Sequence, residues 1–175
     1  LQLYDEAELL QTVQGIGSAA KTLRFLNAEG TEQALCWADN ELQALSLYGI
    51  RPLLYGGTGY PLRLMTCNDA PLVLYQLGPA NLNAKHVVSI VGTRHCTPEG
   101  RQRTQQLVQT LHQRYGHQLL VVSGLAKGID VSAHRQALAD NIATVGILGH
   151  GLGTLYPAAH RPEAEAMARQ GALLT

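Results

Sequence analysis

Three short stretches that combine glycine with small or basic residues could bind a phosphate. They read VGTR at 91–94, SGLAKG at 123–128 and LGHGLG at 148–153. Glycine lets backbone amides come close to a ligand, and the start of a helix attracts negative charge. Two of the stretches also carry a cation, and an arginine can bind an oxyanion through two hydrogen bonds. The residues expected to contact a phosphate or DNA are Gly92, Thr93, Arg94, Ser123, Gly124, Lys127, Gly128, Gly149, His150 and Gly151.

Other chemistries lack their motifs. Each glycine turn alone is more typical of simple packing, and the combination of three turns with two cations favours a ligand. The chain has neither a GxGxxG dinucleotide fingerprint at the first turn nor a GxxxxGK[ST] phosphate loop, which disfavours a redox enzyme or a nucleoside triphosphatase. Ser123 lies in VVSGL, which is not the GxSxG of a nucleophilic serine. Without HxxxH or HExxH, we expect no metal site, and without the dinucleotide fingerprint we expect no cofactor.

Asp130 and His134 lie four residues apart, on one face of an expected helix, where they could pair directly. No recognisable nucleophile accompanies them. A structural role, holding the helix start against the neighbouring loop, is therefore favoured over a catalytic one. Tyr156-Pro157 is interpreted as a rigid turn. We predict no catalytic residue.

Strands and helices alternate from residue 86 onwards, which predicts an α/β fold with a doubly wound, Rossmann-like sheet. The stretch 97–116 predicts a helix with Thr97 as its cap, Pro98 at its first position, and Leu107, Val108 and Leu111 facing inward. Ligands of such sheets bind beyond the carboxyl ends of the strands, where the three glycine turns fall. The expected strands are 86–93, 118–124, 143–151 and the start of one at 172–175, and the other expected helices are 126–141 and 160–171.

The first half of the chain has a different organisation. Residues 1–47 read as helical, with a Gly-Ile-Gly turn at 15–17 that could be a tight connection or a DNA-contacting hairpin. Residues 48–85 are rich in proline and glycine and predict an extended connector with edge strands. Residues 86–175 form the expected Rossmann-like core. The start at Leu1 and the end at GALLT lead us to expect an excised fragment of a longer protein.

Composition sets limits on the class of protein. With 46% hydrophobic and 15% charged residues, the 175-residue chain can bury a core. No apolar run is long enough for a membrane span, and three cysteines without a CxxC fit a reducing cytoplasm. The net charge is zero, but residues 1–50 hold seven acids and two bases, whereas residues 51–150 hold nine bases and four acids. This distribution is either chance or a polyanion-binding core with an acidic appendage.

Several of these stretches together resemble a known family. SIVGTR, VSGLAKGIDVSAH, TVGILGHGL, LYP and GALLT, in this order and at this spacing, resemble the DprA/Smf family of DNA-processing proteins. GYPLRLMTCNDAPLVLYQLG resembles the segment that precedes the fold in that family. The likeness is close over residues 50–175. The Gly-Ile-Gly turn resembles a helix-hairpin-helix or SAM-like region more weakly.

The resemblance implies an extended Rossmann fold that binds and protects single-stranded DNA without sequence preference. It further implies loading of a RecA-type recombinase during natural transformation, the formation of dimers, and no catalytic turnover. The basic site would map onto Arg94 and Lys127. Because Phe25 and Trp37 lie in the helical region and leave only tyrosines near the core, we expect phosphate contacts to matter more than base stacking. Two alternatives stay open: a nucleotide-hydrolysing enzyme of the LOG type, although LGHGLGTLYP carries no catalytic glutamate, and an interaction module formed by residues 1–47.

Overall fold

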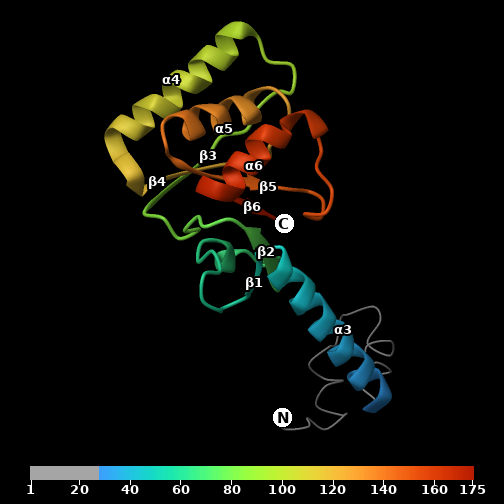
Figure 1. The fold of residues 1–175 in the computed structure, drawn as a ribbon. Coiled ribbons are helices and arrows are strands. Elements are labelled where there is room, and N and C mark those ends of the chain that lie inside the picture. Colours follow the sequence, from blue (N-terminus) through green and yellow to red (C-terminus); the bar gives the residue numbers. More distant parts are fainter. Residues whose placement is uncertain (1–27) are drawn as a thin grey trace. The chain divides into compact units, whose positions relative to one another are not determined.

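The computed structural model describes residues 28–175 (Figure 1). The chain divides into two units, Leu1–Tyr48 and Gly49–Thr175. The described part of the first unit is helix α3, Ala28–Leu47. The stretch EGTEQAL at 29–35 predicts a helix with Thr31 as its cap, but Thr31 lies inside α3, which already begins at Ala28. The Gly-Ile-Gly turn and the helix-hairpin-helix interpretation lie outside the described residues.

A six-stranded mixed sheet forms the centre of the second unit. The strands lie in the order β1-β2-β6-β5-β4-β3. Strands β3 to β6 are parallel, and β2 pairs antiparallel with both β1 and β6. The parallel strands are neighbours in chain order, so each crossover moves one place along the sheet. The bounds are Ile50–Leu54 for β1, Val73–Leu77 for β2, His86–Ser89 for β3, Leu119–Ser123 for β4, Ala143–Ile147 for β5 and Ala172–Leu174 for β6.

Helices α4, α5 and α6 lie side by side on one face of the sheet (Figure 1). Right-handed crossovers that always advance in the same direction place every connecting helix on the same face. The α/β class is confirmed. Within the described residues, the crossovers between the parallel strands all advance in one direction, and their helices lie on one face of the sheet. The helices span Pro98–Tyr115 for α4, Ile129–Ala139 for α5 and Arg161–Gln170 for α6, with 3-10 turns at Leu64–Thr66, Gly116–Gln118 and Ala158–His160.

Helix α4 begins as its sequence predicts. Thr97 is the N-cap, and its hydroxyl oxygen accepts a hydrogen bond from the Gly100 amide at 3.1 Å. The inward stripe is only partly predicted. Val108 is fully buried, but Leu107 is 48% exposed. The buried residues of α4 are Thr104 and Val108, which lie one helical turn apart on the same face, and Leu107 lies beside that face.

Residues 50–85 cover the other face of the sheet and also extend the sheet itself. Strand β1 is at the edge, where its Pro52 is tolerated. The prediction of an edge strand is wrong for β2, because β1 and β6 pair with it on both sides. The core on this face joins Tyr60 and Leu82 to strand side chains such as Val145.

Candidate functional site

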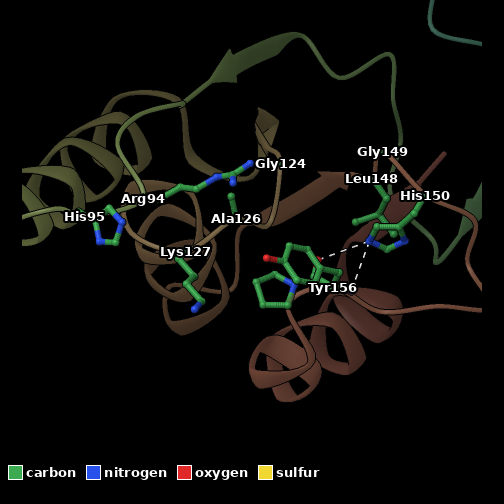
Figure 2. Close-up of a pocket in the computed structure, with 10 residues that line it drawn as sticks. Arg94, His95, Gly124, Ala126, Lys127, Leu148, Gly149, His150 and Tyr156 are labelled. Atoms are coloured by element: carbon green, nitrogen blue, oxygen red, sulfur yellow. Dashed lines mark hydrogen bonds between the residues drawn. The ribbon is translucent and has the colours of Figure 1, made fainter.

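A cavity of about 450 Å³ opens at the carboxyl ends of β3, β4 and β5 (Figure 2). Its walls come from the three loops that follow these strands, as the sequence predicts for a parallel sheet. Arg94 comes from the first loop, Lys127 from the second, and His150 and Tyr156 from the third. The full lining is Arg94, His95, Gly124, Ala126, Lys127, Leu148, Gly149, His150, Tyr156 and Pro157.

The cavity has the electrostatic character of an anion site. Arg94 and Lys127 are both exposed, and neither joins a salt bridge within residues 28–175. No aspartate or glutamate is among the lining residues. Two unpaired cations beside glycine backbone can meet an oxygen-rich anion without displacing an existing partner.

Gly128 joins the first two walls. It has φ +84° and ψ −121°, and a Cβ added there would lie 2.2 Å from the Thr93 carbonyl oxygen. The same oxygen accepts a hydrogen bond from the Ile129 amide at 3.2 Å. The first helical amide of α5 is therefore already bound by the loop after β3. The anion would thus meet the side chains of Arg94 and Lys127 rather than this amide.

Asp130, in the first turn of α5, holds the turn that follows β4. Its Oδ2 accepts a hydrogen bond from the Gly124 amide at 3.2 Å, and the side chain is buried. Asp130 and His134 share no hydrogen bond. His134 binds β5 instead: its Nδ1 lies 2.7 Å from the hydroxyl of Thr144, and this hydroxyl donates to the Val121 carbonyl. The His134 ring therefore donates from Nδ1.

His134 carries no charge at neutral pH. Burial lowers its pKa to about 4, and the opposing attraction of Asp130 is the smaller effect. It therefore adds nothing to the positive field of the cavity. The spacing of Asp130 and His134 suggests acid-base chemistry, but Asp130 holds the Gly124 amide and His134 holds Thr144 of β5.

The third wall is braced by His150. Its Nε2 accepts a hydrogen bond from the Tyr156 amide at 3.3 Å, and its Nδ1 donates to the Gly151 carbonyl at 3.1 Å. The hydroxyl of Thr175 donates to the His150 carbonyl at 3.0 Å. Tyr156 precedes a cis peptide bond to Pro157 and has 67% of its surface exposed. An accessible aromatic ring thus lies in the same cavity as the two cations (Figure 2).

The structure brings together half of the predicted contact residues. Arg94, Gly124, Lys127, Gly149 and His150 line the cavity. Two of the others have packing or hydrogen-bond contacts within the fold: a Cβ on Gly92 would meet the Ile129 side chain, and the Ser123 hydroxyl donates to the Ile90 carbonyl. The predicted residues outside the lining are Gly92, Thr93, Ser123, Gly128 and Gly151.

Sequence reasoning missed part of the lining. His95 and Leu148 directly adjoin predicted contact residues, so a wider window around each turn would have included them. Ala126 falls inside the SGLAKG turn but has no polar side chain to attract notice. Tyr156 and Pro157 were assigned a structural role alone, yet both face the cavity.

The described part of the chain contains neither a helix that could cross a membrane nor a cluster of metal-binding side chains. In residues 28–175 no helix has the length and apolar character needed to cross a membrane. Over the same residues, no group of three or more histidine, cysteine, aspartate or glutamate side chains is arranged to hold a metal ion.

Comparison with known proteins identifies the family. A family model described as DNA recombination-mediator protein A matches residues 51–175. The chain belongs to this family. DNA processing protein DprA of Streptococcus pneumoniae is 37% identical over 102 residues, covering 58% of this chain and 35% of that protein. Protein Smf of Escherichia coli is 29% identical over 170 residues, covering 97% of this chain and 42% of that protein. The chain thus spans less than half the length of these relatives, and the predicted DprA/Smf resemblance is confirmed.

Solved structures of the family have the same fold. DNA processing protein A of Streptococcus pneumoniae matches with a TM-score of 0.72 at 26% identity, covering 99% of this chain and 56% of that chain. DNA processing protein A of Helicobacter pylori matches with a TM-score of 0.60 at 26% identity, covering 73% of this chain and 55% of that chain. The latter structure is described with its single-stranded DNA binding mode. These likenesses confirm the Rossmann-like class of the sheet.

Proposed function

We propose that this chain binds single-stranded DNA through its phosphates, without sequence preference, at the cavity beyond β3, β4 and β5. One observation carries the proposal: Arg94 and Lys127 reach the same acid-free cavity from successive loops. Single strands are bound sequence-independently where a positive groove follows the backbone and aromatic rings meet the bases. Tyr156 supplies such a ring, so base stacking adds to the phosphate contacts.

We extend this proposal to the role of the whole protein. Membership of a recombination-mediator family supports a DNA-binding protein without catalytic turnover, which loads a RecA-type recombinase onto DNA in natural transformation. Homodimer formation and a cytoplasmic location belong to the same proposal. A helical region at 1–47, a connecting region at 48–85 and a DNA-binding core at 86–175 are its proposed domains.

The salt dependence of binding tests the phosphate contacts. Fluorescence anisotropy with labelled oligo-dT is measured for the intact protein between about 50 and about 200 mM salt. Each phosphate contact on a single strand contributes about −0.7 to the slope of log K against log salt concentration. Arg94→Ala and Lys127→Ala should each weaken binding and make this slope shallower by about 0.7.

Arg169→Ala is the matched control. Arg169 lies in the last turn of α6, which leads into the amino end of β6, whereas the cavity lies at the carboxyl ends of the parallel strands, so the same charge is removed far from the cavity. Its loss should leave the slope unchanged. Oligo-dA and mixed sequences should lose affinity by the same factor as oligo-dT. The proposal is excluded if the unaltered protein does not bind oligo-dT, or if its affinity does not change with salt concentration. Release of free base from a nucleoside monophosphate would support the LOG-type enzyme instead.

A further inference from the structure

The turn after β4 contains an unusual backbone conformation. Leu125 has φ +56°, in the left-handed region that a leucine seldom adopts. Its side chain is completely buried among Leu148, Met167 and Leu173. The neighbours of Leu125 on either side, Gly124 and Ala126, line the cavity. The conformation of this one residue therefore decides how the turn presents its cavity-facing atoms.

His160 holds this conformation from another part of the chain. Its Nδ1 lies 2.8 Å from the Leu125 carbonyl oxygen, and since that oxygen can only accept, Nδ1 donates. The His160 side chain is buried, at the end of the short turn Ala158–His160 before α6. This turn directly follows Tyr156 and Pro157, which form the third wall of the cavity. The hydrogen bond thus ties the second wall to the third.

The residues on either side of Leu125 are held as well. The Gly124 amide donates to the buried carboxylate of Asp130, and the Ala126 carbonyl accepts from the Val131 amide at 3.1 Å. Both of these contacts come from α5, the helix that the turn itself leads into. His160 is the contact that comes from the opposite wall.

We propose that His160 is a positioning residue of the DNA site, which keeps Leu125 left-handed so that Lys127 and Tyr156 face one cavity. The inference rests on the proposed function, because the ligand is the single strand bound there. Without the imidazole, a buried carbonyl loses its donor and Leu125 can relax towards the ordinary backbone region. Lys127, two residues further on, would then move relative to Tyr156.

The donor, and not the ring, is the feature that the test isolates. His160→Leu removes the donor and should weaken oligo-dT binding about tenfold, the effect of one buried hydrogen bond left unmade. His160→Asn should bind like the unaltered protein, because the asparagine Nδ2 is as many bonds from the backbone as the histidine Nδ1. Should the leucine variant fail to fold, His160→Ser replaces it: serine is a good helix cap but is too short to reach Leu125.

Gln170→Leu is the matched control. Gln170 is the last residue of α6, and its side chain likewise donates to a backbone carbonyl of another element, that of Leu138 in α5 at 3.2 Å, but neither residue lines the cavity. Its loss should leave oligo-dT binding within about twofold, a change well below that of a lost buried hydrogen bond at the site.

Hydrogen exchange of the ligand-free protein supplies a readout that does not require DNA. Peptides covering residues 123–128 should exchange faster in His160→Leu or His160→Ser, and at the unaltered rate in His160→Asn and Gln170→Leu. Unaltered binding and exchange in the leucine or serine variant would overturn the positioning role, and so would an asparagine variant as impaired as either. If the unaltered protein does not bind oligo-dT, the proposed function fails and the exchange rates alone decide on the positioning role.

Discussion

Gly128 occupies a position where two walls of the cavity touch through their backbones. Its φ of +84° and ψ of −121° belong to a region that is essentially restricted to glycine. A Cβ there would lie 2.2 Å from the Thr93 carbonyl oxygen and 2.9 Å from the carbonyl group of Arg94. Because these atoms are backbone, no side-chain rotation can relieve the collision.

Gly128→Ala should therefore be costly. The backbone conformation alone costs about 1–3 kcal/mol for a residue with a Cβ. The collision must also displace the loop of Thr93, whose carbonyl accepts from the Ile129 amide, and overpacking of this kind costs about 1–3 kcal/mol. We expect the free energy of unfolding to fall by about 3–5 kcal/mol, a large part of the roughly 5–15 kcal/mol typical of a domain.

Gly116→Ala separates the two contributions. Gly116 has φ 55° and ψ −141°, close to the conformation of Gly128, but nothing lies within 4 Å of an added Cβ. The effect of alanine on the unfolded chain is the same at both positions and cancels. Urea unfolding followed by far-UV circular dichroism should show Gly128→Ala to be less stable than Gly116→Ala by about 2 kcal/mol. Equal costs at the two positions would refute the contact between the walls.

Three further changes test the site and its support. Between about pH 7.5 and about pH 5, His134→Gln should lose about 2 kcal/mol less of its free energy of unfolding than the unaltered protein. The reason is the lowered pKa of His134: as the pH falls, the unfolded chain takes up a proton there, whereas the folded chain does so only near pH 4. The sign is therefore a loss of stability as the pH falls through 6.5, and an unchanged pH dependence of the free energy of unfolding in the variant would contradict it. Gly149→Ala should alter the free energy of unfolding by less than about 0.5 kcal/mol, since the added Cβ meets nothing within 4 Å, so a drop in oligo-dT affinity reports a ligand close to that backbone. Tyr156→Ala should lower oligo-dT affinity about tenfold and Tyr156→Phe hardly at all, because stacking needs the ring and not the hydroxyl; anisotropy measurements in which the two variants behave alike would argue against stacking.

The parallel part of the fold could be predicted from the sequence because its signals are local. Buried parallel strands read as short apolar runs, and Thr97 with Pro98 marks the start of α4 unambiguously. The place of β2 could not be predicted in this way. Its position between β1 and β6 depends on a partner almost at the other end of the described chain, and no local pattern encodes that pairing.

The site was predicted at the level of loops and only in part at the level of residues. Because the strands are parallel, the three glycine turns that follow them lie together at the carboxyl ends of the strands. Which glycine faces the ligand is a different matter: Gly149 is open, whereas Gly128 is filled by the Thr93 carbonyl, and both look alike in the sequence. His160 gave no signal, because its hydrogen-bond partner lies 35 residues earlier in an irregular turn.

The pairing of β2 with β6 has a consequence for the order of folding. Successive strand-helix units from β3 to β5 can assemble as neighbours in the chain, with only short loops to close. The β1–β2 hairpin precedes them in synthesis, yet its place in the sheet exists only once Leu173 and Leu174 have been added at the far side. One edge of β2 therefore stays unpaired until nearly all of the described chain has been synthesised. Between the synthesis of β2 and that of β6, the unpaired edge of β2 is available to a wrong strand.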